Sequence, residues 1–158
     1  MSVDSFKRAL FARKKEPIYP PYFSGKFECL ECDAKPCIAI CERNLLEFNG
    51  EFVEFKTNNY GCNFCKKCAL SCENAGKNSL NLKFDKSINA KATININSCL
   101  SWNETVCYNC GDACKFNAID FFGIFKPTIN SNCIGCGECV GVCFVKSVSL
   151  KGFKKEMI

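Results

Sequence analysis

Histidine is absent from this sequence of 158 residues, and tryptophan occurs once. Without histidine the chain cannot build a Ser/His or Cys/His catalytic pair, and it lacks a common zinc ligand. No apolar run approaches the roughly 18 residues of a membrane span. The first residues, MSVDSFKRALFARKKEP, contain neither the apolar core nor the cleavage site of a secretory signal. We therefore expect a soluble, cytoplasmic chain with reduced thiols and no substrate site of its own.

Cysteine, in contrast, is abundant, with 16 residues in four groups of four. Two groups repeat the spacing C-x2-C-x2-C-x3-C, and the other two are stretched, with four residues between Cys32 and Cys37 and seven between Cys99 and Cys107. The groups are Cys29, Cys32, Cys37 and Cys41; Cys62, Cys65, Cys68 and Cys72; Cys99, Cys107, Cys110 and Cys114; and Cys133, Cys136, Cys139 and Cys143. A loop with this spacing wraps an iron–sulfur cluster. The four groups therefore predict four [4Fe–4S] clusters with every cysteine as a ligand to iron.

A cysteine content this high also occurs in disulfide scaffolds and in zinc-binding domains. Disulfide-dense chains are secreted, and close C-x2-C-x2-C triplets suit ligation of a compact cluster better than cross-linking of distant strands. Structural zinc usually takes two separated C-x2-C pairs, often with histidine. A zinc-binding interaction module is therefore the weaker alternative, and it suits the stretched third group best.

The net charge of +5 is misleading because it counts each cysteine as neutral. An oxidised [4Fe–4S] core with four thiolates carries about −2, so four of them bring the loaded protein to about −3. This removes the electrostatic reason for binding nucleic acid. Because so much of the apolar fraction is cysteine, we also expect the metal-free chain to fold poorly.

The spacing of the groups indicates an internal repeat, since their first cysteines lie 33, 37 and 34 residues apart. The third and fourth cysteines of each group are separated by one helical turn, which favours a short helix there. Apolar runs after the groups predict strands at 45–48, 80–84, 118–122 and 148–150, with partners at 52–55, 93–96 and 127–129. Asn49-Gly50 and Gly123 mark turns between them. Each unit is predicted to contain a cysteine loop, a short helix, a strand, a turn and a strand.

This order of elements resembles the bacterial two-cluster ferredoxin module used twice, an α+β fold of short helices and small antiparallel hairpins around clusters. The resemblance implies modules at 25–90 and 91–152, a basic N-terminal arm at 1–24 and a tail at 153–158. In such modules the fourth cysteine of one motif binds the cluster held by the first three of its partner. The implied ligand sets are Cys29, Cys32, Cys37 and Cys72; Cys62, Cys65, Cys68 and Cys41; Cys99, Cys107, Cys110 and Cys143; and Cys133, Cys136, Cys139 and Cys114.

A second wiring stays open. In it the first group exchanges its fourth cysteine with the last group, and the two middle groups exchange theirs with each other. This wiring resembles that of the electron-transfer subunits of some large oxidoreductases. We favour exchange between sequence neighbours because consecutive elements usually pack together. The position of Cys72 separates the two wirings.

The residues around the cysteines suggest how clusters would be shielded. Small residues let backbone N–H groups approach the sulfurs, and the candidates are Gly61, Gly111, Gly135 and Gly137. Apolar residues between the ligands should exclude water, and these are Ile38, Phe64, Leu70, Ile134 and Val140. No fourth cysteine is followed by the proline usual in two-cluster ferredoxins. Either the exits from the loops are looser, or other residues adopt the same conformation.

Two further segments allow two interpretations each. Trp102, in the insertion between Cys99 and Cys107, either shields a cluster, which we favour because large aromatic residues are mostly buried, or docks a partner. The basic N-terminal arm either contacts an acidic partner or a membrane surface, or it is a solvated terminus. Its apolar and basic residues are Phe6, Lys7, Arg8, Leu10, Phe11, Arg13, Lys14 and Lys15.

The stretched third group, SCLSWNETVCYNCGDACKFNAI, and the approach YPPYFSGKFEC resemble the NapF family of ferredoxin-type proteins, over about residues 5 to 150. This resemblance implies a cytoplasmic iron–sulfur accessory protein that transfers single electrons. Its implied partner is the molybdenum-containing catalytic subunit of periplasmic nitrate reductase, which it would help to mature before export. An electron-wire subunit of a larger oxidoreductase complex is the alternative.

Overall fold

The computed structural model describes residues 15–123 and 125–154, so of the eight apolar and basic residues named for the N-terminal arm only Lys15 lies within the described residues. Its elements are short and connected by long loops. In chain order they are α2 (Pro36–Ala39), β1 (Leu46–Phe48), β2 (Val53–Phe55), α3 (Lys67–Asn74), β3 (Ala90–Ile94), the 3-10 helix η1 (Ser101–Asn103), α4 (Asn109–Asp112), β4 (Ile119–Phe122), β5 (Lys126–Ile129), α5 (Glu138–Gly141) and β6 (Val148–Gly152). The predicted α+β class with short helices and small antiparallel pairs of strands is confirmed.

The helices form where the cysteine spacing predicts them. Each begins one residue before the third cysteine of its group, at Cys37, Cys68, Cys110 and Cys139. Three are single turns of four residues, and only α3, with eight, also contains its fourth cysteine, Cys72. Helices this short are unstable alone, so packing of the cysteine loops must hold them.

Two of the predicted strand pairs form hairpins, β1 with β2 and β4 with β5. The first turn lies at Asn49-Gly50, as predicted, but it spans four residues because Phe48 pairs with Val53. Gly50 adopts a positive φ of 101°, and the Asn49 side chain accepts hydrogen bonds from the backbone N–H groups of residues 51 and 52. The amide side chain therefore reinforces a turn that the backbone also closes, since the N–H of Asn49 donates to the carbonyl of Phe52 at 3.1 Å.

The strands after the second and fourth groups pair differently from the prediction. β3 pairs antiparallel with β6, far along the chain, and begins three residues before the predicted strand at 93–96. The strand predicted at 80–84 is wrong, because only Leu80 pairs, in an isolated bridge with Phe23. The next residues turn instead, since the Asn81 side chain accepts a hydrogen bond from the backbone N–H of Lys83. The repeat unit of loop, helix and hairpin thus holds for the first and third groups only.

Buried side chains are divided unevenly between the first half of the chain, residues 15–87, and the second half, residues 90–154. The larger buried cluster contains Tyr22, Phe23, Cys29, Cys37, Leu45, Leu46, Phe52, Val53, Phe55, Ala69, Cys72, Leu80, Ile88 and Ala90. The smaller one contains Ala92, Cys110, Cys139 and Val148. Half of the smaller cluster is cysteine, so the interior of the second half depends strongly on what those thiols bind.

Asn89, in the segment that connects the two halves, binds both ends of the described chain. Its side-chain oxygen accepts a hydrogen bond from the N–H of Tyr19 at 2.7 Å. Its side-chain nitrogen donates to the carbonyls of Pro17 and Phe153, both at 2.9 Å. These bonds satisfy backbone groups that would otherwise be costly to bury.

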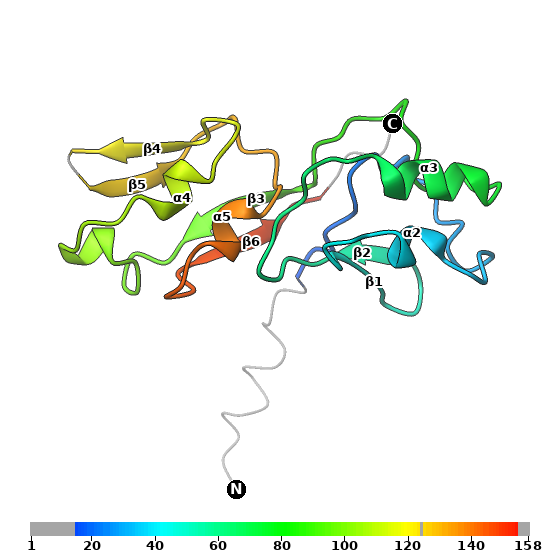
Figure 1. The fold of residues 1–158 in the computed structure, drawn as a ribbon, viewed down its shortest axis with the longest axis horizontal. Helices are drawn as coiled ribbons and strands as arrows, with labels where there is room; N and C mark the ends of the chain where they lie inside the picture. The colour runs from blue at the N-terminus through cyan, green and yellow to red at the C-terminus, as the bar shows by residue number, and fades with distance from the viewer. Residues whose placement is uncertain (1–14, 124, 155–158) are drawn as a thin grey trace, which may run out of the picture.

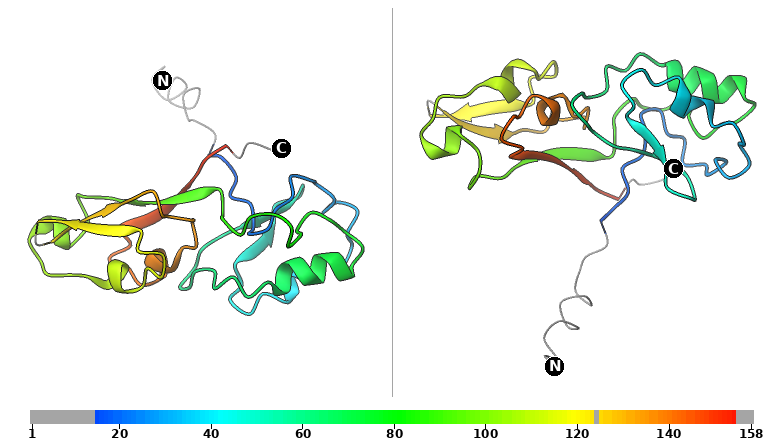
Figure 2. Two further views of the ribbon diagram at one scale, coloured as in Figure 1. Left: turned by 90° about the horizontal axis from the view of Figure 1, so that it is seen from above. Right: turned by 60° about the horizontal axis from the view of Figure 1, so that its bottom comes forward.

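The elements lie in a row along the longest axis of the molecule. Helices α2 and α3 lie at one end and the β4–β5 hairpin at the other, with α5, β3 and β6 between them (Figure 1). The same separation is seen from above in Figure 2. Within the described ranges, no helix has the length and apolar character needed to cross a membrane.

Candidate metal centres

The sixteen cysteines line four cavities, with four cysteines in each. Site A is lined by Cys29, Cys32, Cys37 and Cys72, and site B by Cys41, Cys62, Cys65 and Cys68. Site C is lined by Cys114, Cys133, Cys136 and Cys139, and site D by Cys99, Cys107, Cys110 and Cys143. Every site combines the first three cysteines of one group with the fourth of the neighbouring group. These are the sets that the ferredoxin resemblance implies, whereas the second wiring would place Cys72 in another site.

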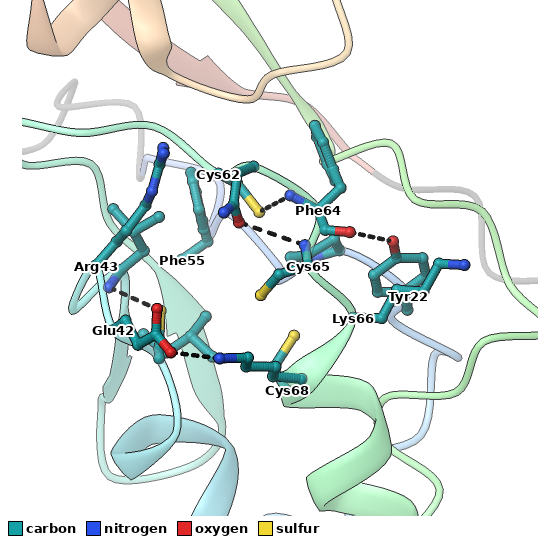
Figure 3. A pocket seen from close by; sticks show the side chains of 15 residues that line it. Tyr22, Glu42, Arg43, Phe55, Cys62, Phe64, Cys65, Lys66 and Cys68 are labelled. Carbon is teal, nitrogen blue, oxygen red and sulfur yellow. Dashed lines mark hydrogen bonds and ion pairs between the residues drawn. The ribbon is translucent and has the colours of Figure 1, made fainter.

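The exchange of the fourth cysteine follows from helix geometry. Cys68 and Cys72 lie on α3 four residues apart, a rise of about 6 Å. Side chains at this spacing share one face of the helix but lie one above the other. Cys68 therefore reaches site B while Cys72 reaches site A. Figure 3 shows Cys62, Cys65 and Cys68 around the space of site B.

All sixteen cysteines are free thiols. In the part of the chain that the structure describes, no three or more Cys, Asp or Glu side chains converge closely enough to hold a single metal ion. The sulfurs of each site instead surround a cavity. Four thiols around a cavity match the donor set of an iron–sulfur core, in which each cysteine binds a different iron.

Backbone N–H groups donate hydrogen bonds to the fourth cysteine of each group, in a pattern that repeats along the chain. In three groups the donor lies four residues after the cysteine: Leu45 to Cys41 at 3.5 Å, Ala118 to Cys114 at 3.3 Å, and Ser147 to Cys143 at 3.3 Å. At Cys72, where α3 continues, the donor is Leu80 at 3.4 Å. Such bonds favour the thiolate and tune the potential of a bound cluster.

The exits from these loops share one conformation although proline is missing. The third residue after the cysteine has a left-handed φ in three groups, at Asn44, Asn117 and Lys146. Its N–H donates to the carbonyl of the cysteine, for example from Asn44 to Cys41 at 2.9 Å. These three exits are therefore regular turns without proline, and the interpretation that other residues adopt the proline conformation stays a prediction.

Two buried serines next to the sites were not found from the sequence. The Ser147 hydroxyl lies 3.2 Å from the sulfur of Cys143, and the Ser79 hydroxyl lies 3.8 Å from that of Cys29. Both serines are buried. Burial acts to raise the pKa of the Cys143 thiol, but the hydrogen bonds from Ser147 outweigh it and the pKa is lowered. Site D thus has one cysteine whose thiolate form is favoured more than that of an ordinary cysteine.

For the third cysteine of each group the net pKa shift is upward, because burial dominates. It raises the pKa of Cys37, Cys68 and Cys139 to about 12 and that of Cys110 to about 11, helped by the neighbouring cysteine charges. These thiols are neutral near pH 7 in the metal-free fold. Binding to iron must therefore displace their protons.

The raised pKa values predict that the metal-free fold loses stability in alkali. For Cys37 and Cys68, the stabilisation is present below the ordinary pKa of 9.0 and is lost as pH rises toward about 12. We expect the far-UV circular dichroism signal of the metal-free protein, which reports the structure remaining in its first half, to decline over this range. The loaded protein, whose thiols are already deprotonated, should change much less. Equal declines with and without clusters would contradict this explanation, and metal-free protein kept at neutral pH is the control for oxidation.

The residues predicted to shield the sites have mixed outcomes. Phe64 lines site B and Ile134 lines site C, as predicted. Leu70 does not shield a site, because its position on α3 leaves it 45% exposed. The favoured interpretation of Trp102 is also wrong, since it does not line site D. Its ring nitrogen donates to the carbonyl of Pro127, which does line that site, and so anchors the insertion to β5.

The glycines mostly serve close packing between loops. A Cβ at Gly61 would lie 2.2 Å from the backbone nitrogen of Glu138, and one at Gly135 would lie 2.5 Å from the carbonyl of Ala90. Gly111 differs, because its backbone hydrogen bond acts on the Cys110 thiol, as predicted for a glycine near a cluster. The ion pair of Arg43 with Glu138 also lies at the Gly61 contact, and no sequence pattern indicated it.

No protein-family model matches the sequence. The chain is similar to the ferredoxin-type protein NapF of Haemophilus influenzae, with 36% identity over 64 residues. The matched region is 37% of this chain and 36% of that protein, so the chain spans about a third of the curated relative that it matches. The resemblance noted in the sequence is thus supported over part of the chain. The printed name of that relative describes a ferredoxin-type protein, and the sixteen cysteines of this chain agree with an iron–sulfur protein of that type.

Proposed function

We propose that this protein is a cytoplasmic accessory protein that carries up to four [4Fe–4S] clusters in two tandem two-cluster modules and passes single electrons. The observation that carries this proposal is the gathering of the sixteen cysteines into four cavities of four. No other described feature has this regularity. The clusters would supply the one-electron chemistry, and the chain would bind and insulate them.

The protein's own groups act on the ligand sulfurs. Backbone donors such as Leu45 and Ala118 stabilise negative charge on the fourth cysteine of each group. Apolar residues such as Phe64 and Ile134 limit water around the sites. Since hydrogen bonding and solvent exposure set cluster potentials, sites with different surroundings should have different potentials.

The proposed partner is the molybdenum-containing catalytic subunit of periplasmic nitrate reductase. Support comes from the name of the ferredoxin-type relative and from the resemblance of the third cysteine group to that family. The proposed role is to assist maturation of that subunit in the cytoplasm before export, by supplying electrons. An alternative role as an electron-wire subunit is favoured by one observation. The helices that carry the third cysteines are spread along the longest axis of the molecule, with α2 and α3 at one end, α5 in the middle and α4 beyond it (Figure 1).

Metal analysis tests the cofactor part of the proposal. Protein purified without oxygen should contain about 16 iron and about 16 sulfide per chain if all four sites are filled. Reduction should give the EPR signals of [4Fe–4S] clusters. Iron well below this amount together with bound zinc would favour the zinc-binding interaction module instead.

Affinity capture from cells grown on nitrate tests the partner. The accessory role predicts transient recovery of a cytoplasmic, not yet exported catalytic subunit. A stoichiometric complex with other redox subunits would support the electron-wire role and contradict the maturation role. A variant that lacks site A and site D ligands, tested in parallel, shows whether capture needs filled sites.

A further inference from the structure

The two halves of the chain meet between the two inner sites, B and C. We call this contact the junction, formed by residues 57–64 of the first half and 134–141 of the second. The backbone N–H of Cys62, in site B, donates a hydrogen bond to the carbonyl of Cys136, in site C, at 2.7 Å. One hydrogen bond thus joins a cysteine of one site directly to a cysteine of the other.

Glycine makes this approach possible. A Cβ at Gly61 would lie 2.6 Å from the Cys136 carbonyl oxygen, and one at Gly141 would lie 2.4 Å from the carbonyl oxygen of Asn59. A Cβ at Gly137 would meet the Thr57 side chain at 2.2 Å. Gly61 and Gly141 therefore permit a backbone contact that any larger residue would prevent, and Gly137 leaves room for the Thr57 side chain.

An ion pair closes the same contact. Arg43 donates to the carboxylate of Glu138 at 2.5 Å and to the carbonyl of Gly61 at 2.6 Å. The carboxylate also accepts a hydrogen bond from the Gly61 N–H at 3.3 Å. The two side chains are only 31% and 19% exposed. Arg43 follows the first cysteine group and Glu138 lies in the fourth, so the pair fixes the first half against the second.

An aromatic pair completes the junction. Phe64 lines site B, Phe116 lines site C, and their rings meet edge to face with centroids 5.8 Å apart. The pair places apolar surface between the two sites. The pKa shifts agree with this neighbourhood, because the Cys62 thiol, whose pKa is raised first by burial, is also affected by the charge of Cys136.

The neighbouring pairs of sites are joined through their own halves. Sites A and B share helix α3, which carries Cys68 and Cys72. Sites C and D share the segment from Cys139 to Cys143, which runs through α5. With the junction added, the order of the sites is A, B, C, D.

We propose that the junction couples sites B and C, so that the four sites form one continuous row and not two independent pairs, with Arg43 and Glu138 as positioning residues. The inference rests on the proposed function, since it concerns filled sites. With all sites filled, an electron leaving one inner cluster would enter the other, so that one would be oxidised as its neighbour was reduced. Electrons taken up at site A could then be delivered from site D.

The test isolates the inner sites. In the full chain, Cys32→Ala and Cys107→Ala together remove a ligand from each outer site and leave the inner sets intact. After dithionite reduction, EPR should show a spectrum split by magnetic interaction between two neighbouring clusters. Adding Gly61→Ala should abolish or clearly reduce the splitting, because the new Cβ must push the loops apart. Gly111→Ala is the matched control, since its Cβ would meet only the movable Phe121 ring, away from the junction.

Iron content distinguishes failure of this inference from failure of the proposed function. The variant with Cys32→Ala and Cys107→Ala alone should contain about 8 iron per chain. If it does but its two clusters give unsplit EPR spectra, the coupling is overturned and cluster binding still stands. An unchanged splitting in the Gly61→Ala variant would also overturn it. Glu138→Gln keeps the shape of the side chain but removes the ion pair, so it should partially weaken the splitting. It replaces Gly61→Ala in the same measurement if that variant does not fold. Equal splitting with and without the Glu138→Gln change would overturn the positioning role of the pair.

Discussion

Replacing Cys72 with alanine is expected to empty site A and to leave site B filled. Cys72 and Cys68 lie on the same helix, but Cys72 lines the cavity of Cys29, Cys32 and Cys37. A [4Fe–4S] cluster without one of its four thiolates is exposed to loss, so the variant should lose about 4 iron per chain. Cysteines released from the cluster then become accessible to alkylation. Mass spectrometry after brief anaerobic alkylation should find label on Cys29, Cys32 and Cys37.

The matched variant is Cys68→Ala, four residues earlier on the same helix. It should empty site B, so that label appears on Cys62, Cys65 and Cys41, while Cys72 stays protected. Ser71→Ala, between the two cysteines, controls for disturbance of the helix itself. If Cys72→Ala instead labels Cys62 and Cys65, each group holds its own cluster, and the exchange of ligands is refuted. Label on Cys99, Cys107 and Cys110 would support the second wiring.

Much of the site follows from local sequence, because short spacings fix local geometry. The spacing of four residues from Cys68 to Cys72 suffices to predict a helix with both on one face, and the resemblance to ferredoxins adds where each side chain goes. The hairpin at Asn49-Gly50 is likewise local, since asparagine and glycine close the turn themselves. These features need no information from distant parts of the chain.

The errors concern residues whose position depends on distant partners. The strand prediction at 80–84 is wrong because only Leu80 pairs, with Phe23, and the polar residues after it form turns. Trp102 fails because its ring nitrogen bonds the Pro127 carbonyl across the second half. An apolar or aromatic residue indicates burial but does not say against which element.

The junction shows the same limit at its clearest. Arg43 and Glu138 are 95 residues apart in sequence, and either one alone reads as an ordinary surface charge. Phe64 adopts a positive φ of 56°, which is unusual for a bulky residue, and Gly135 takes the same place in its own loop with 76°. A rule that assigns positive φ to glycine predicts the conformation of Gly135 but misses that of Phe64.

Removal of the clusters is expected to unfold the second half of the chain while part of the first half persists. The four residues of the smaller buried cluster include two cysteines, which leaves Ala92 and Val148 as its fully buried side chains of other types. Only partly buried apolar residues pack against them, namely Ile94, Ile119, Ile129, Val140 and Leu150, so this core is much smaller than that of the first half. The second half therefore depends on metal ligation for its stability.

The first half keeps a core that does not consist of ligands. Tyr19 stacks on Phe23 with ring centroids 4.4 Å apart, and Phe27 and Phe52 meet edge to face at 5.4 Å. Leu45 and Phe55, both 2% exposed, extend this core under the β1–β2 hairpin. Burial of large side chains stabilises by about 1.5–3 kcal/mol each, so this region should retain structure without iron.

Hydrogen exchange followed by mass spectrometry measures the difference directly. After anaerobic removal of iron with a chelator, peptides from 91–152 should exchange fully within the shortest labelling time. Peptides covering 44–56 should keep measurable protection, and the loaded protein should protect both regions. Val148→Ala should accelerate exchange of the second half in the loaded protein, whereas Phe55→Leu should remove the residual protection of the metal-free first half. Equal and complete exchange of both halves after iron removal would mean that the aromatic core is itself held by site A, whose cavity Phe23 lines. In that case the whole fold, and not the second half alone, would depend on its clusters.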